Sequence, residues 1–204
     1  MSQPFLAPAT LGTTLHHQGG FSLIEVLVAV IILSIGVFGA VGMQVTSLQA
    51  SKDVRYQAIA GSMARELAEK MRGNHAVAIT TTVVANPYLL DTTLAAASTV
   101  AVPALNCYTT SCPTGVDIAR WDIYDWQLRL KDALPSPRVA ICMDKTPFAG
   151  GMPQWGCSNT GDVAVLKLAW NRVNTKGELE FTTVAGGTPT IPLLVLPLTA
   201  GSSQ

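Results

Sequence analysis

Charged residues are scarce in this chain, and neither sign dominates. Asp, Glu, Lys and Arg make up 13% of the 204 residues, and the formal net charge is zero. Proteins that bind nucleic acid normally carry a basic surface that neutralises phosphates, so this charge balance argues against nucleic acid as a partner. The chain is long enough for one modest folded domain and an additional membrane segment.

Histidine is also scarce. The chain has three histidines, and two of them, His16 and His17, lie in residues 1–20. A catalytic site built on histidine would therefore depend on His75, which has no candidate nucleophile beside it. The sequence also lacks a glycine-rich phosphate loop, a His-x-x-x-His pair and carboxylates at the spacing of metal ligands. We expect no enzyme, no cofactor and no metal site. Three carboxylates are interpreted as the exposed face of a helix: Asp122, Asp125 and Asp132.

Basic residues are missing from the beginning of the chain, where the first Lys or Arg is Lys52. Lys52 and Arg55 are followed by further basic residues up to Arg72. Short basic flanks of a membrane helix usually stay in the cytoplasm, so this rule taken alone would place the C-terminal part there.

One long apolar segment stands out against this background. From Phe21 to Met43 the only charged residue is Glu25, and Gly19 and Gly20 precede the segment. As a helix, these residues would extend about 35 Å, enough to cross a bilayer with some tilt. An acidic residue inside a membrane helix costs about 2.5–3.5 kcal/mol, so Glu25 is expected to be functional. A buried charge is tolerated chiefly when it meets an opposite charge.

The sequence Gly20-Phe21-Ser22-Leu23-Ile24-Glu25 resembles the processing site of type IV prepilins and type II secretion pseudopilins. The resemblance implies that a prepilin peptidase cleaves between Gly20 and Phe21 and methylates Phe21. It also implies that Glu25 pairs with the terminal ammonium of a neighbouring subunit. Residues 1–20 would be the leader, 21–73 a long helix with 21–43 in the membrane, and 74–204 the globular domain. This resemblance overrides the charge rule and places the domain in the periplasm, and later on an extracellular pilus.

The apolar periodicity predicts that the helix continues to residue 73. Between Tyr56 and Met71, apolar residues recur at spacings of three or four, which places them on one helix face. Glu66 and Lys70 are expected to form an i,i+4 ion pair on another face. Gly73 and Asn74 are expected to end the helix.

The globular domain is predicted to contain a second helix and an antiparallel sheet. The helix covers 118–132, with Asp117 as N-cap and with Trp121 and Trp126 in the core. The 163–170 and 178–184 segments are expected to form a hairpin whose turn is 174–177. The fold class is therefore α+β, with a long helix packed on a small antiparallel sheet. The candidate strands are Ile79–Val84, Arg138–Met143, Val163–Trp170, Glu178–Val184 and an edge strand, Ile191–Leu198.

Four cysteines lie beyond the apolar segment, at Cys107, Cys112, Cys142 and Cys157. Disulfides are expected if this side is periplasmic, and four cysteines allow three pairings. We favour Cys107–Cys112 and Cys142–Cys157, because each pair closes a local loop that contains turn residues. A zinc site is the alternative, but the spacing between Cys142 and Cys157 does not fit it.

The 44–72 helix and the 117–143 segment are similar to the PilV family of minor pilins, although less closely than the N-terminus is to prepilins. This resemblance implies a minor type IV pilin in a priming or tip complex. Its partners would be the prepilin peptidase, other minor pilins, the major pilin, the inner-membrane assembly platform and, before assembly, membrane lipid. Two alternatives stay open: a type II secretion minor pseudopilin, and a membrane-anchored periplasmic hydrolase or binding protein.

Overall fold

The computed structural model describes residues 20–173, 179–180 and 190–198. The chain forms two compact units that divide between Gln44 and Val45. Both contribute to helix α1 (Leu23–Gly73), which has nearly the predicted bounds.

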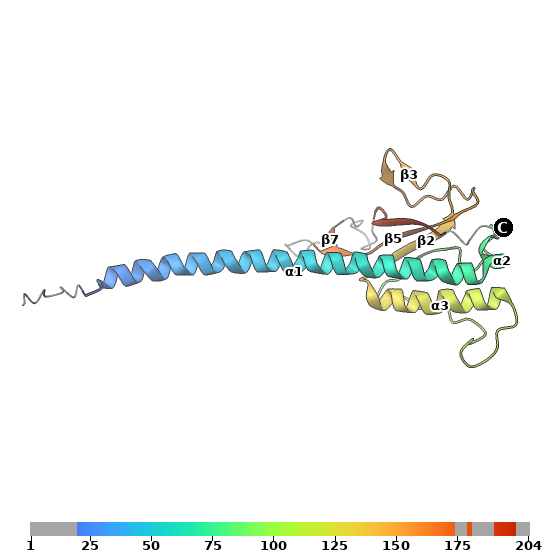
Figure 1. Ribbon diagram of the computed structural model, residues 1–204, viewed down its shortest axis with the longest axis horizontal. Helices are drawn as coiled ribbons and strands as arrows, with labels where there is room; N and C mark the ends of the chain where they lie inside the picture. The colour runs from blue at the N-terminus through green and yellow to red at the C-terminus, as the bar shows by residue number, and fades with distance from the viewer. Residues whose placement is uncertain (1–19, 174–178, 181–189, 199–204) are drawn as a thin grey trace, which may run out of the picture. The chain divides into compact units, whose positions relative to one another are not determined.

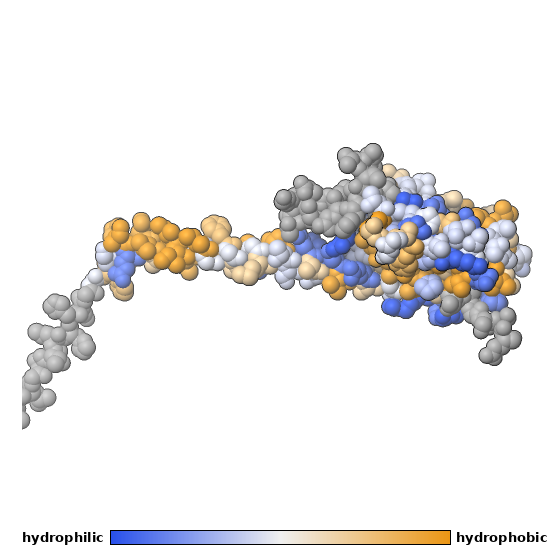
Figure 2. Space-filling view, turned by 90° about the horizontal axis from the view of Figure 1, so that it is seen from above, coloured by the Kyte–Doolittle hydropathy of each residue, from blue (hydrophilic) through white to orange (hydrophobic). Residues whose placement is uncertain are grey.

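The first unit is the apolar beginning of α1. Every residue from Gly20 to Gln44 is exposed, and Figure 2 shows the hydrophobic surface that the beginning of this helix presents. Within the described part of the chain, α1 is the one helix long and apolar enough to cross a membrane. A helix that is hydrophobic on all sides needs an apolar environment around it.

The second unit contains a four-stranded antiparallel sheet in the order β1-β2-β5-β8, which is also their order along the chain. Figure 1 shows the second half of α1 between this sheet and helix α3. The other helices are α2 (His75–Ala78) and α3 (Gly115–Ala133). The sheet strands are β1 (Leu90–Thr93), β2 (Arg138–Met143), β5 (Ala164–Ala169) and β8 (Leu194–Leu198). Two small hairpins consist of β3 (Phe148–Ala149) with β4 (Met152–Pro153), and β6 (Arg172–Val173) with β7 (Leu179–Glu180). The α+β prediction is confirmed.

The core lies between the helices and the inner face of the sheet. Alternate residues of β2 and β5, such as Ile141 and Leu166, join the same buried cluster as Leu67 of α1. Trp126 of α3 is fully buried, and its indole N–H donates to the carbonyl oxygen of Met63 at 2.9 Å. This bond fixes α3 against α1, because a buried indole N–H requires an acceptor.

The predicted start of α3 was wrong by three residues. Thr114, not Asp117, is the N-cap, and its hydroxyl accepts a hydrogen bond from the backbone N–H of Asp117. The same hydroxyl donates to the Asp117 carboxylate at 2.6 Å. Asp117 is thus a first-turn acid, and this arrangement resembles a capping box. Trp121 is only partly buried and contacts Tyr108 edge-on, whereas the core prediction for Trp126 is confirmed.

Two predicted strand assignments were also wrong. Residues 79–84 form turns and bends, and the strand in this region is instead β1. The neighbours of β5 are β2 and β8, whereas β7 pairs with β6. The predicted turn at 174–177 and most of the 178–184 segment lie outside the described residues. The edge strand predicted over 191–198 is confirmed in its second part, since Leu194–Leu198 form β8 with Pro197 inside it.

Ion pairs between α1 and α3 replace the predicted pair within α1. Glu66 binds Arg129, and Lys70 binds Asp122 at 2.8 Å. Asp122 also accepts a hydrogen bond from the hydroxyl of buried Tyr88. Its side chain is only 15% exposed, so the interpretation of Asp122 as a solvated residue was wrong. Asp132 is exposed as predicted, and Asp125 forms an i,i+4 pair with Arg129.

Candidate processing and assembly site

The candidate processing site lies where α1 begins. Gly20, Phe21 and Ser22 precede the helix, and the Ser22 carbonyl accepts hydrogen bonds from the backbone N–H groups of Glu25 and Val26. Glu25 is therefore in the first turn of α1. A carboxylate is favoured there because the helix dipole places partial positive charge at this end.

The side chains around this carboxylate are exposed. Phe21 is 83% exposed, and Leu23 and Ile24 are similarly accessible. An exposed apolar surface of this kind marks a site of contact with lipid or protein. Within the described part of the chain, the side chain of Glu25 forms no hydrogen bond or ion pair. The geometry thus leaves the carboxylate available to a cation from another molecule.

Comparison with known families bears directly on this segment. Residues 15–41 match the family model of the prokaryotic N-terminal methylation motif. This match supports a type IV prepilin-like protein. The motif implies processing by a prepilin peptidase and assembly with other pilins, and it indicates a membrane-anchored structural subunit of the pilin or pseudopilin type. No curated protein and no solved structure matches the chain.

Two disulfides lie in the second unit. Cys107 is bonded to Cys112 and Cys142 to Cys157, which is the pairing favoured from the local loops. The bonded sulfurs are not zinc ligands in this state. Cys107–Cys112 lies just before α3, whereas Cys142–Cys157 connects the end of β2 to the loop before β5. We call residues 144–160 the clamp loop.

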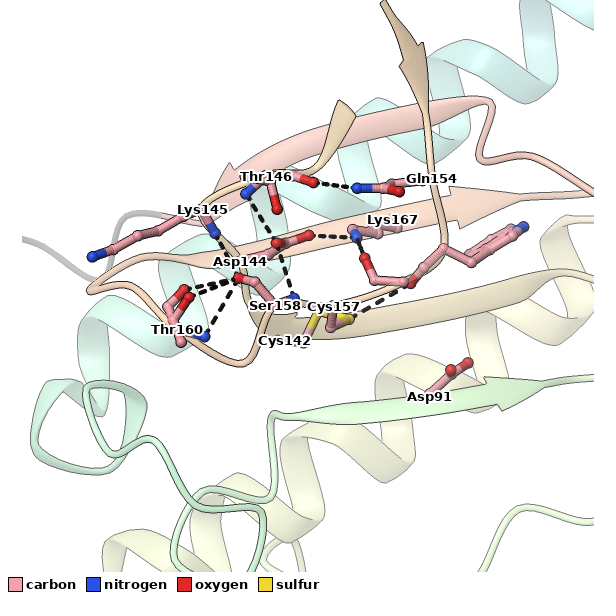
Figure 3. Close-up of a disulfide and its surroundings, with 12 residues drawn as sticks. Asp91, Cys142, Asp144, Lys145, Thr146, Gln154, Cys157, Ser158, Thr160 and Lys167 are labelled. Carbon is pink, nitrogen blue, oxygen red and sulfur yellow. Dashed lines mark hydrogen bonds and ion pairs between the residues drawn. A yellow bond between two sulfur atoms is a disulfide. The ribbon is translucent and has the colours of Figure 1, made fainter. Parts of the chain in front are cut away.

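The clamp loop is also held by a buried ion pair, shown in Figure 3. The ammonium of Lys167, on β5, donates to the carboxylate of Asp144 and to the carbonyl oxygen of Gly156. Backbone N–H groups of Thr146 and Ser158 donate to the same carboxylate. A buried charge pair is tolerated when such hydrogen bonds satisfy both partners.

These contacts determine the protonation of Asp144. Burial acts to raise the pKa of its carboxyl group, but the hydrogen bond from Lys167 opposes this effect. Bonds from Thr146 and Ser158 add to the stabilisation of the charged form, and together they lower the pKa to about 2. Asp144 is therefore charged at neutral pH and retains its pairing with Lys167.

The sequence contains a signal for this pair. Lys167 is the only charged residue in the apolar strand segment 163–170. A lysine in such a segment must either reach solvent or find a buried partner. The identity of that partner, Asp144, depends on the fold of the clamp loop. His75, by contrast, lies in the short helix α2, and we assign it no chemical role.

Proposed function

We propose that this chain is a minor type IV pilin of the PilV kind. It is held in the inner membrane by 21–43 before assembly, with its 74–204 domain in the periplasm, and afterwards belongs to an extracellular pilus. Residues 1–20 are its leader. The methylation motif at the head of an exposed apolar helix is the observation that carries this proposal.

In this proposal, cleavage falls between Gly20 and Phe21, and Phe21 becomes the methylated N-terminus. The exposed carboxylate of Glu25 then pairs with the terminal ammonium of a neighbouring subunit. Its position in the first helical turn supports this role, since the carboxylate lies close to the new chain end. Pairing offsets the cost of moving the charge into the apolar core of a filament.

The partners in this proposal are other minor pilins and the major pilin, in a priming or tip complex at the inner-membrane assembly platform. The two disulfides support a periplasmic location for the domain, because disulfides persist in oxidising compartments. The disulfide evidence outweighs the basic flank from Lys52 to Arg72, which alone would place the domain in the cytoplasm.

A type II secretion minor pseudopilin is the second candidate, because the matched motif is compatible with both assemblies. The two differ in the phenotype of a deletion strain. Loss of twitching motility with normal enzyme secretion supports the pilin, whereas loss of secreted hydrolases with normal motility supports the pseudopilin.

Intact-mass measurement of the protein purified from its native membrane tests the processing proposal. We expect the mass of residues 21–204 plus one methyl group. Gly20→Val replaces the small residue at the cleavage site and should prevent cleavage, so the protein should keep the mass of residues 1–204. The control Gly36→Val, in helix α1, should still be processed. A native protein that retains Met1 contradicts the proposal and favours a membrane-anchored periplasmic protein of another class.

A further inference from the structure

A cavity of about 430 Å³ lies beside β1 and β2, at the end of the clamp loop. Its volume falls within the usual range for small-molecule sites, which is roughly 300–1,000 Å³. Apolar walls come from residues such as Val83 and Leu89. Polar side chains that line it include Asp91 on β1, Arg138 on β2 and Asn159 in the clamp loop.

Arg138 is the central cation of this cavity. Its guanidinium lies over the ring of Trp155, 4.2 Å from the ring centroid, and 3.7 Å from the carboxylate of Asp91. Asp91 and Arg138 are diagonal neighbours on adjacent strands, because Arg138 is registered opposite Thr93. The side chain of Arg138 is only 24% exposed, so these two contacts fix its position.

The polar side chains Asp91, Arg138 and Asn159 make few contacts with the protein itself, and Asp91 and Asn159 are exposed. The distance from Arg138 to Asp91 is too long for a hydrogen bond, and within the described residues neither side chain forms another. The amide of Asn159 likewise makes no hydrogen bond to the described part of the protein. A carboxylate acceptor, a guanidinium donor and an amide with both functions therefore converge on one space.

The clamp loop holds this arrangement in place. Lys167 binds the carbonyl of Gly156, which follows Trp155, and Asp144 binds the backbone of Ser158, which precedes Asn159. The Cys142–Cys157 disulfide lies between these two contacts along the loop. Trp155 and Asn159 are thus each next to a residue that the buried pair anchors, and a preorganised site loses less entropy when it binds a ligand.

We propose that this cavity binds a neutral saccharide of one or two rings. Sugar hydroxyls both donate and accept hydrogen bonds, which matches the mixed set of Asp91, Arg138 and Asn159. The C–H faces of a sugar ring match the apolar walls. A simple anion fits less well, because the Asp91 carboxylate lies close to Arg138, the one cation among the described residues that line the cavity, and repels negative charge.

Indole NMR of the full chain in lipid nanodiscs tests this proposal. Nanodiscs are needed because glucoside and maltoside detergents would compete as ligands. The chain has four tryptophans, so indole labelling gives few signals, and the signal of Trp155 is the one lost in Trp155→Phe. Glucose, galactose, mannose and N-acetylglucosamine are titrated separately, with sodium acetate as the anion probe. We expect at least one sugar to shift the Trp155 signal saturably, with a Kd on the order of 1 mM.

Asp91→Asn and Arg138→Gln should each weaken this binding at least tenfold while the other indole signals stay in place. The matched controls, Asp132→Asn and Arg120→Gln, change exposed residues of α3 outside the cavity and should bind like the wild type. The proposal is overturned if no sugar produces a saturable shift, or if acetate alone does. It is also overturned if both cavity variants bind sugar with unchanged affinity.

Discussion

The ammonium of Lys167 lies 2.5 Å from the carboxylate of Asp144, and neither side chain is exposed to solvent. The two residues are separated by 23 positions in the chain, on β5 and at the beginning of the clamp loop. Their pairing fixes the loop to the outer face of the sheet, and the loop in turn carries Trp155 and Asn159.

Removing the ammonium should destabilise the domain strongly. In Lys167→Met the side chain keeps much of its volume, but Asp144 is left buried without its cation. Such a loss costs about 3–5 kcal/mol in the free energy of unfolding. Urea unfolding of the full chain in detergent micelles measures this change.

Two further variants separate charge from packing. The double variant Lys167→Met with Asp144→Leu removes both charges and should recover most of the lost stability. Arg120→Met breaks a pair with Asp117 in which the arginine side chain is 52% exposed, and it should cost less than about 1 kcal/mol. If Lys167→Met is no more destabilising than Arg120→Met, the buried pair does not hold the loop.

Acid should weaken the domain through Asp144. The pKa of this carboxyl is lowered to about 2 in the folded protein from its ordinary value of 3.8. Its stabilisation is therefore complete above about pH 5 and is lost progressively as the pH falls toward 2. The lost contribution is on the order of 2 kcal/mol.

The pH effect is isolated by measuring urea unfolding at pH 6 and at pH 3. Asp144→Asn should be less stable at pH 6 and should lose less further stability at pH 3 than the wild type. Asp132→Asn, which changes an exposed carboxylate, should show the wild-type loss. Equal losses in all three proteins would exclude Asp144 as the acid-sensitive group.

The two disulfides should contribute unequally to the stability of the domain. The Cys142–Cys157 bond closes a loop with a sequence separation of 15, and the Cys107–Cys112 bond one with a separation of 5. Loop-closure entropy predicts about 3 kcal/mol for the longer loop and about 2 kcal/mol for the shorter one. Replacing each pair by serines should therefore lower the melting temperature more for Cys142 and Cys157. The reverse order, or no change on reduction, would contradict this ranking.

The assignment of Thr114 as the N-cap of α3 can be tested by comparing two threonine substitutions. Thr114→Ala should cost about 1 kcal/mol, because the backbone N–H of Asp117 loses its acceptor. Thr109→Ala serves as the control, since its exposed hydroxyl bonds only to a carbonyl in its own turn. Equal stability of the two variants in thermal unfolding would contradict the assignment of Thr114.

Glu25→Val should leave cleavage largely intact but reduce incorporation into pili, if the proposed pairing with a neighbour's N-terminus is correct. Immunoblots of sheared pili and of the membrane fraction give the incorporated share. Ser34→Ala is the control, because it changes a small polar residue of the same helix without changing charge. Normal incorporation of Glu25→Val would remove the basis for the pairing role.

The sequence was informative wherever a local pattern determined the structure. The apolar run and its helical periodicity predicted α1, and Gly73 ends this helix as expected. The predicted bounds of β2, Arg138–Met143, are those observed, because a short apolar run lies between Pro137 and Asp144. The prepilin-like character likewise depends on adjacent residues from Gly20 to Glu25.

Local patterns did not predict ion pairs correctly where a charged side chain has more than one possible partner. Lys70 has Glu66 one helical turn away, yet it binds Asp122, which is 52 positions distant. Glu66 binds Arg129 instead, and this contact lowers the pKa of its carboxyl group. The partner of each charge depends on which helix packs beside α1, and side-chain spacing along one helix does not contain that information.

Local sequence was thus sufficient to predict the apolar helix, its methylation motif and the positions of strands β2, β5 and β8, because backbone preference and hydrophobic periodicity act over a few residues. The folded structure was needed to show that Asp144 meets Lys167, that the Asp122 side chain is only 15% exposed, and that Asp91, Arg138 and Asn159 line one cavity. These contacts arise when distant segments exclude water together, and the free energy of a desolvated charge depends on all the groups around it.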